Sequence, residues 1–248
     1  MTRLLLATVL LLSVSIAAQA GETNVAVAAN FTAPAKEIAK SFEEKTGHKA
    51  ILSFGATGQF FAQIKQDAPF TVLLAADDET PKRAVEEGLA VADSRFTYAI
   101  GRLVLWSKNP AMVTDEGALK TAAFEKLSIA NPALAPYGAA AVQTMKKLGV
   151  YDALQPRIVQ GNTIAQAFQF AETGNAEVGF VALSQVIERP EGSRWVVPET
   201  QHDPIRQDAV LLKKGATDET AKAFLAYLKG LEAGAVIAKF GYGTAASN

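Results

Sequence analysis

The chain has no cysteine, only two histidines and no excess of basic side chains. Without cysteine there is no disulfide framework and no thiol to carry a lipid. The histidines, His48 and His202, lie far apart in the sequence, and neither has a second histidine at helical spacing, which argues against a zinc site. Lys and Arg number 24 against 25 Asp and Glu, so the charge excludes a typical nucleic-acid-binding protein.

Long hydrophobic runs are also scarce, and the one present lies at the N-terminus. Arg3 precedes an apolar run at residues 4–18, followed by Ala18-Gln19-Ala20, the small-residue pattern of a signal-peptide cleavage site. The run is shorter than the roughly 18 to 20 residues needed to cross a membrane. We therefore expect residues 1–20 to be a cleavable signal peptide, and the mature protein to be periplasmic without a membrane anchor.

Sequence signatures of common enzymes are absent. The chain contains no G-x-S-x-G, H-E-x-x-H or G-x-x-x-x-G-K-[ST] motif. Asp77 and Asp78 are a candidate acid pair, but adjacent residues in a strand-to-loop segment tend to point apart. Acids before a helix usually compensate its dipole, and we expect Thr80 to cap a helix that begins at Pro81. We predict no catalytic residue and no cofactor, and a secreted hydrolase stays an alternative.

Strands alternate with helices along the chain, which predicts an α/β protein with mostly parallel sheets. Four strands lead through an uncharged turn directly into a helix. The four turns contain, in order, Asn30 and Thr32; Gly55-Ala56-Thr57-Gly58; two prolines followed by Tyr137; and Asn162-Thr163. Since no low-complexity linker divides the chain, we expect two lobes joined by crossing strands. The predicted first lobe contains residues 21–100 and 207–248, and the second contains residues 101–206.

Uncharged turns at helix starts can bind an anion. The first N–H groups of a helix have no partner within it, and the helix dipole favours negative charge there. About six or seven charge-assisted donors could give micromolar affinity for a dianion. Taken one at a time, each turn is better explained by ordinary capping, by Thr32 or Thr163 for example, than by anion binding. Sequence spacing alone does not show whether the four turns meet.

Five segments together resemble the periplasmic molybdate-binding proteins of ABC transporters, over essentially the whole mature chain. The matching segments are Ala29-Asn30-Phe31; Gly55-Ala56-Thr57-Gly58; residues 94–107; Asn131-Pro132 with Ala135-Pro136-Tyr137-Gly138; and Gly179-Phe180-Val181-Ala182-Leu183. The resemblance implies a bilobal type II solute-binding fold with the ligand in the cleft between the lobes. It also implies a monomeric receptor that delivers its ligand to a membrane permease.

The resemblance implies that the ligand is a molybdate or tungstate dianion, so that molybdenum is present only as molybdate. It also implies, position by position, which residues bind this ligand. They are Ala29 and Asn30, Thr57, Tyr137, and Ile164 through its backbone N–H. We expect Asn30 to act as a neutral amide donor and Thr32 to cap its helix. Thr57 stands where the family usually has serine. Ala182 stands where many members have tyrosine, and we expect Tyr137 or Asn30 to compensate. A receptor for another tetrahedral oxyanion such as sulfate stays an alternative.

Overall fold

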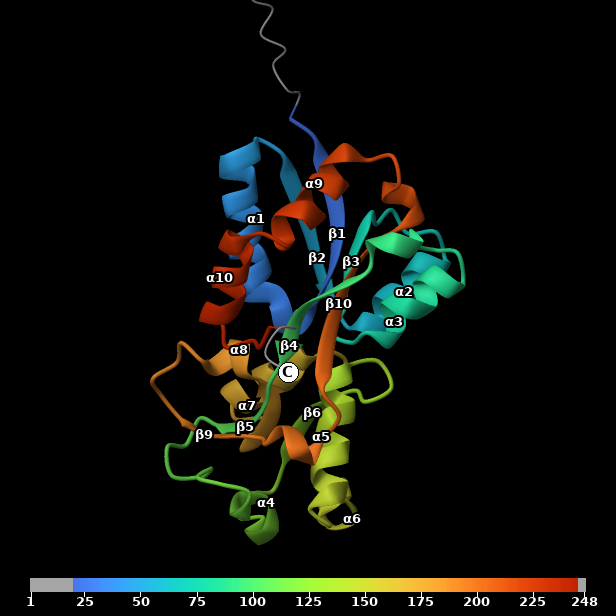
Figure 1. Ribbon diagram of the computed structural model, residues 1–248. Coiled ribbons are helices and arrows are strands. Elements are labelled where there is room, and N and C mark those ends of the chain that lie inside the picture. Colours follow the sequence, from blue (N-terminus) through green and yellow to red (C-terminus); the bar gives the residue numbers. More distant parts are fainter. Residues whose placement is uncertain (1–19, 245–248) are drawn as a thin grey trace, which may run out of the picture.

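The computed structural model describes residues 20–244, which form two lobes placed end to end (Figure 1). The predicted signal peptide lies, apart from Ala20, outside the described residues. Each lobe is built on one five-stranded sheet. Within residues 20–244, no helix has both the length and the apolar character needed to cross a membrane.

The first lobe is built on a sheet with three neighbouring parallel strands. In spatial order its strands are β2 (Lys49–Gly55), β1 (Glu22–Ala28), β3 (Val72–Leu74), β10 (Ile205–Leu211) and β4 (Phe96–Gly101). Strand β1 pairs in parallel with β2 and with β3, and β10 is antiparallel to both β3 and β4. The carboxyl ends of β1, β2 and β3 therefore meet at one edge, which faces the second lobe.

The second lobe repeats this arrangement with different strands. Its sheet contains, in spatial order, β7 (Ile158–Gly161), β6 (Leu127–Ala130), β8 (Val178–Ala182), β5 (Leu103–Ser107) and β9 (Ser193–Val196). Strand β6 is parallel to β7 and β8, whereas β5 is antiparallel to β8 and β9. Among the described strands, half of the pairings are thus antiparallel, and the expectation of mostly parallel sheets was wrong. The antiparallel pairings all involve β4, β5, β9 or β10, the strands next to the crossings between lobes.

Helices cover both faces of the first sheet (Figure 1). On one face lie α1 (Thr32–Thr46), α9 (Glu219–Leu228) and α10 (Leu231–Lys239), and on the other lie α2 (Thr57–Lys65) and α3 (Glu79–Glu86). Two separate cores result. Phe42 and Phe224 pack edge to face in the first core with their ring centroids 5.4 Å apart, and Phe60 and Ile64 lie in the second. Each fully buried side chain of this kind contributes roughly 1.5 to 3 kcal/mol to folding.

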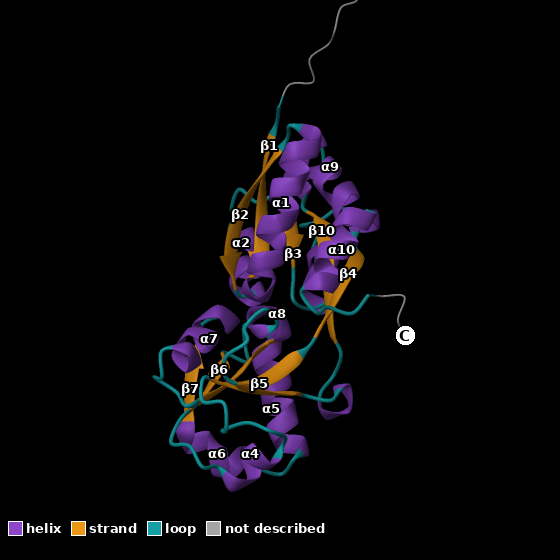
Figure 2. Ribbon diagram, turned by 90° about the vertical axis from the view of Figure 1, so that its left-hand side faces the viewer, coloured by secondary structure: helices purple, strands orange, loops and turns teal. Residues whose placement is uncertain are grey.

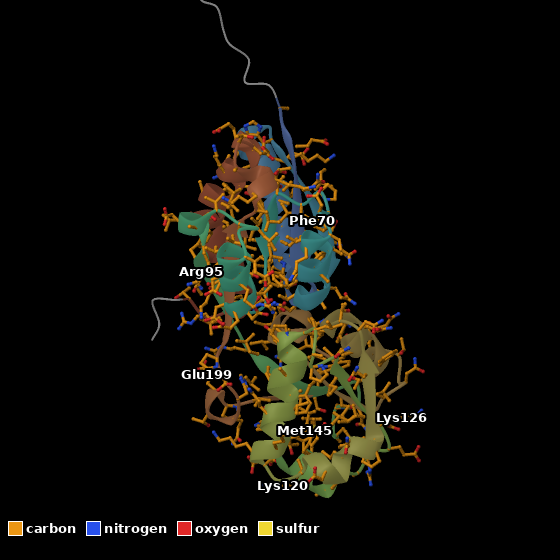
Figure 3. The ribbon with its side chains drawn as sticks, turned by 90° about the vertical axis from the view of Figure 1, so that its right-hand side faces the viewer. Phe70, Arg95, Lys120, Lys126, Met145 and Glu199 are labelled. Atoms are coloured by element: carbon orange, nitrogen blue, oxygen red, sulfur yellow. The ribbon has the colours of Figure 1, made fainter. Side chains whose placement is uncertain are left out.

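The second lobe is covered by shorter helices. They are α4 (Gly117–Thr121), α5 (Pro136–Lys147), α6 (Tyr151–Leu154), α7 (Ile164–Glu172) and α8 (Leu183–Val186). Figure 3 labels Met145 of α5 in this lobe and Phe70 in the first lobe. The main core of the second lobe also includes Ala28, Ala29, Ala56 and Ala76, which belong to the first lobe. The two lobes therefore share an apolar contact built from small side chains.

Short 3₁₀ turns complete the chain. They are η1 (Ala29–Phe31), η2 (Ala92–Ser94), η3 (Gln155–Arg157), η4 (Glu199–Gln201) and η5 (Lys213–Gly215). Because η1 continues into α1, Thr32 already lies inside the helical segment. Its hydroxyl donates to the Ala29 carbonyl at 2.8 Å, and its side chain makes no capping hydrogen bond. The prediction that Thr32 caps the helix was wrong.

The start of α3 also differs from the prediction. The helix begins at Glu79, two residues before Pro81. Oδ1 of Asp77 accepts the Thr80 N–H at 2.7 Å, and Oδ2 accepts the Thr80 hydroxyl at 3.2 Å. A carboxylate three residues upstream thus satisfies the helix start, and Thr80 is not the cap.

The chain passes between the lobes in extended segments (Figure 2). Arg102 alone separates β4 in the first sheet from β5 in the second, and the segment after β9 returns to β10. Direct hydrogen bonds also join the lobes: the Gly58 N–H donates to the Leu134 carbonyl at 2.9 Å, and the Ser184 hydroxyl donates to the Asn30 carbonyl at 2.8 Å. The two lobes are therefore in direct contact.

Candidate anion-binding site

All five residues predicted to bind the ligand line one small pocket between the lobes. Its walls contain, from the first lobe, Ala28, Ala29, Asn30, Gly55, Ala56, Thr57 and Ala76 and, from the second, Ala135, Pro136, Tyr137 and Ile164. The cavity volume is about 10 Å³. Space of this order suits one small ion or water and excludes most organic ligands, whose sites usually exceed about 300 Å³.

The first lobe presents two helix starts to this pocket. Strand β1 ends at Ala28 and η1 follows at once, so the N–H groups of Ala29 and Asn30 precede the first bonds of the helical segment. Thr57 is the first residue of α2, and its Oγ1 accepts the Ala76 N–H at 3.0 Å. That bond fixes the Thr57 side chain and leaves its hydroxyl proton for another acceptor. At these starts, the N–H groups of Asn30 and Thr57 have no acceptor within their own helical segments.

The second lobe presents two more helix starts. Pro136 occupies the first position of α5, where its missing N–H costs nothing, and places Tyr137 in the first turn. Ile164 is the first residue of α7. Thr163 caps this helix by accepting the Gln166 N–H on its hydroxyl at 3.1 Å, and the N–H of Ile164, at the first position, has no acceptor within the helix.

The electrostatics of the pocket favour an anion. None of the residues that line it carries a formal charge. Four helical segments begin at its walls, and each contributes the positive end of its dipole. A cation would instead need oxygen ligands, and no group of three His, Cys, Asp or Glu residues that could hold a metal ion occurs in the described part of the chain.

The Asn30 side chain does not act as the sequence predicted. Its Nδ2 donates to Oε1 of Gln207 at 2.8 Å and to the hydroxyl of Tyr242 at 3.0 Å. Both side-chain N–H groups are therefore used behind the pocket wall, and the prediction of a side-chain amide donor was wrong. What Asn30 offers to an anion is its backbone N–H. Its carbonyl faces the other way and accepts from the hydroxyls of Ser184 and Tyr242 at 2.8 Å each.

Three buried tyrosines stand next to one another at the pocket: Tyr137 lines it, and Tyr98 and Tyr242 lie behind it. Burial raises the pKa of Tyr98 and Tyr137 well above the usual value, and it also raises the pKa of Tyr242. All three phenols stay protonated at neutral pH and can donate. The Tyr98 hydroxyl contacts the Ala75 carbonyl at 2.9 Å and Oε1 of Gln207 at 3.1 Å, so this residue supports the pocket from behind and does not line it.

Sequence reasoning missed the residues that hold this network together. Gln207, Tyr242 and Ser184 lie outside the four helix starts, and each is buried. Gln207 had a detectable signal, because it is the one polar residue among the alternate positions Ile205, Gln207, Ala209 and Leu211 that share a face of β10. Tyr242 had none, since it follows the last helix.

The remaining candidates have structural roles. The Nδ1 atom of His48 accepts the Gly21 N–H at 3.0 Å, and Nδ1 of His202 contacts the Asp203 carbonyl at 2.7 Å. The Asp77 carboxylate accepts the N–H and the hydroxyl of Thr80 at the start of α3. Ala182 ends β8, is fully buried and does not line the pocket. The expectation that Tyr137 or Asn30 compensates for Ala182 stays a prediction.

Comparison with known proteins places this geometry in a family. A family model described as bacterial extracellular solute-binding protein matches residues 23–243. The chain belongs to this family. Among its relatives, the molybdate-binding protein ModA of Rhodobacter capsulatus is 57% identical over 235 residues, covering 95% of this chain and 93% of that protein. The ModA protein of Azotobacter vinelandii is 59% identical over 231 residues, covering 92% of each.

A solved structure agrees with these relatives. The periplasmic molybdate-binding protein of Azotobacter vinelandii superimposes with a TM-score of 0.87 at 39% identity, covering 90% of this chain and 99% of the other. The predicted bilobal type II solute-binding fold is confirmed. Because the family consists of binding proteins, the prediction that the chain is not an enzyme is confirmed as well, and the hydrolase alternative is dropped.

Proposed function

We propose that this protein is a periplasmic receptor that binds molybdate, and also tungstate, between its lobes and delivers it to an ABC permease. The observation that carries the proposal is the convergence of four helix starts on one uncharged pocket of about 10 Å³. The molybdate-binding relatives from Rhodobacter capsulatus and Azotobacter vinelandii support the choice of ligand. No cofactor is needed, because the oxyanion is the cargo and molybdenum enters only as molybdate.

The proposed contacts come from both lobes. Ala29, Asn30 and Thr57 offer backbone N–H groups from the first lobe, and Thr57 adds its hydroxyl. Ile164 offers its N–H from the second lobe, and Tyr137 adds a neutral phenol. Micromolar affinity corresponds to a binding free energy of about 8 kcal/mol. Six charge-assisted hydrogen bonds that contribute roughly 1.5 to 3 kcal/mol each would together exceed this value, before the cost of desolvating the dianion is subtracted.

Selectivity in this scheme comes from size and from protonation. The donors suit any tetrahedral dianion, so sulfate is the competing ligand and the dimensions of the closed pocket discriminate against it. Every proposed contact is a donor, so a protonated oxyanion such as hydrogen phosphate would present its own proton without an acceptor. An unsatisfied buried donor costs about 1 to 3 kcal/mol.

The proposed cellular role follows from the direct contact between the lobes. Binding contacts from both lobes stabilise the closed form, and this form is the one recognised by the permease. We further propose that the protein acts as a monomer in the periplasm after removal of residues 1–20. Its charge gives no reason to expect nucleic acid as a partner.

A competition titration tests the proposal. Calorimetry on the mature protein should show submicromolar to micromolar affinity for molybdate and tungstate and at least about 100-fold weaker affinity for sulfate and phosphate, equivalent to about 2.7 kcal/mol. Equal affinity for sulfate and molybdate would show that the protein is a general oxyanion receptor. Absence of binding to all four anions would reject the proposal as a whole.

A further inference from the structure

Gln207 connects residues of both lobes directly behind the pocket. It lies in β10, is fully buried and has three side-chain partners. Its Oε1 accepts from Asn30 at 2.8 Å and from the Tyr98 hydroxyl at 3.1 Å, and its Nε2 donates to the Tyr137 hydroxyl at 3.3 Å. Asn30 and Tyr98 belong to the first lobe, whereas Tyr137 belongs to the second. One amide therefore bridges two residues that line the pocket, one from each lobe.

The local backbone is shaped to accommodate this amide. The pairing of β10 with β4 shifts register between Gln207 and Asp208, which leaves Tyr98 as an extra residue on β4. Such bulges redirect side chains and are frequent beside functional sites. Gly101 of β4 provides the space: a Cβ atom there would lie 2.2 Å from the Tyr137 hydroxyl oxygen and 2.7 Å from Nε2 of Gln207.

The partners fix the orientation of the amide. Asn30 can only donate through Nδ2, so the Gln207 oxygen faces the first lobe and its Nε2 faces Tyr137. The Tyr137 oxygen accepts from Gln207, and its own proton is left for another acceptor. The same amide holds the Asn30 side chain away from the pocket and leaves the backbone N–H of Asn30 facing it.

We propose that Gln207 is a positioning residue for oxyanion binding, acting through Tyr137 and Asn30. This inference rests on the function proposed above. Gln207 does not touch the anion; it sets where the two pocket residues stand when the lobes are closed, and it keeps the Tyr137 proton available as a donor. Removal of a residue in this supporting position typically weakens binding about 10- to 100-fold.

A double-mutant cycle tests the mechanism. Molybdate affinity is measured by calorimetry for wild type, Gln207→Met, Tyr137→Phe and the double variant. We expect Gln207→Met to weaken binding about 10- to 100-fold. When Gln207→Met is added to Tyr137→Phe, the further loss in the logarithm of molybdate affinity should be less than half of the loss that Gln207→Met causes alone. The reason is that the hydroxyl positioned by Gln207 is already absent. If the role of Gln207 were purely structural, the fold-loss of molybdate affinity in the double variant would equal the product of the fold-losses in the two single variants.

Two further variants make the test independent of the methionine substitution. Gly101→Ala places a methyl group against the Tyr137 hydroxyl and should also weaken binding, and Tyr137→Phe should relieve part of that loss. Asp208→Asn is the matched control, since Asp208 is the buried neighbour on β10 and its carboxylate accepts from Arg95 and Thr97 of the first lobe. It should keep molybdate affinity within about twofold. Urea unfolding verifies that each variant is folded.

The outcomes separate this inference from the proposed function. If wild type binds molybdate and Gln207→Met binds it equally well, or the losses in the cycle multiply, Gln207 is not a positioning residue and the receptor function stands. If wild type binds none of the oxyanions, the proposed function fails and this inference fails with it. If Gln207→Met does not fold, the test uses Gly101→Ala instead. The inference is overturned if Gly101→Ala loses molybdate affinity and adding Tyr137→Phe does not reduce that loss.

Discussion

Two adjoining cavities between the lobes share a wall but differ in size and charge. The small pocket has a volume of about 10 Å³ and no charged residue, whereas the groove beside it has a volume of about 580 Å³. Ala76, Ala135 and Pro136 line both. The groove contains the carboxylates Asp77, Asp78, Glu79 and Asp203 together with Arg83 and Arg206.

This difference shows that volume does not identify the ligand site here. The groove could hold a larger molecule, but helix starts face the small pocket. A dianion in the groove would meet four carboxylates against two arginines, an excess of like charge, and like charges at close range cost several kcal/mol at an effective dielectric constant of about 20. The pocket therefore suits an oxyanion, and the groove is the acidic surface beside it.

A carboxylate placed in the pocket should have the largest effect, because it gives the pocket the charge of the groove. Thr57→Asp should weaken molybdate binding at least about 1,000-fold, since a like charge replaces a hydroxyl donor. Thr57→Ser, which keeps the hydroxyl, is the control and should bind within about tenfold of wild type. Calorimetry measures both variants. Near wild-type affinity of Thr57→Asp would place the ligand outside the pocket.

Removal of one backbone donor should have the next largest effect. Ile164→Pro deletes the N–H at the first position of α7, where proline is well tolerated, and the extended Thr163 backbone before it (φ −133°, ψ 164°) suits a following proline. Loss of one charge-assisted bond should weaken molybdate binding about 10- to 100-fold. Ile164→Ala keeps the N–H and is the matched control. Equal affinity of the two variants would exclude this N–H from the site.

Neutralising a carboxylate of the groove should matter much less. Asp78→Asn should change molybdate affinity by less than about threefold at physiological salt, where the Debye length is about 8 Å. At low salt, the variant should associate faster with the dianion, because the remaining field is less negative. Stopped-flow fluorescence at two salt concentrations measures this. A loss of affinity as large as that of Ile164→Pro would move the site into the groove.

The smallest effect concerns stability and pH. Burial raises the pKa of Asp77, and Asp78 and Asp208 add to this, while hydrogen bonds from Thr80 oppose it. A raised pKa means that the carboxyl favours folding below its unfolded pKa, and that this contribution is lost as pH rises through its folded pKa. Asp77→Asn keeps an oxygen to accept the Thr80 N–H and carries no charge.

The Asp77→Asn comparison is made by urea unfolding across pH. The free energy of unfolding of the variant, relative to wild type, should increase from about pH 4 upward and then level off above the folded pKa. A difference that decreases with pH would mean that the Thr80 hydrogen bonds outweigh burial. Molybdate affinity should change little, because Asp77 lines the groove and not the pocket.

Local sequence rules predicted the helix starts well where neighbours in the chain decide them. Pro136 at the first position of α5 and Thr163 as the cap of α7 are set by residues within one turn. The same rules failed at Thr32 and Thr80. In both cases the helix begins earlier than expected, through a 3₁₀ turn at η1 and through the Asp77 carboxylate at α3. The predicted lobe boundaries stay a prediction.

The direction of the Asn30 side chain could not be predicted from its neighbours. Its two partners, Gln207 and Tyr242, lie 177 and 212 residues further along the chain. Polar groups of a buried asparagine must find partners, and which partners are within reach depends on how β10 and the C-terminal segment pack. The resemblance to known receptors identified the residue, and the packing assigned its side chain and its backbone to different tasks.

The sequence by itself determined the uncharged strand-to-helix turns, and with them the chemical character of the site, because strand, turn and helix signals act over a few residues. The tertiary structure alone decided that four turns spread over more than a hundred residues of the chain meet at one pocket of about 10 Å³. It also decided that Gln207 and Tyr242 support that pocket. Contacts between distant segments depend on sheet order and lobe closure, and short-range patterns carry no information about either.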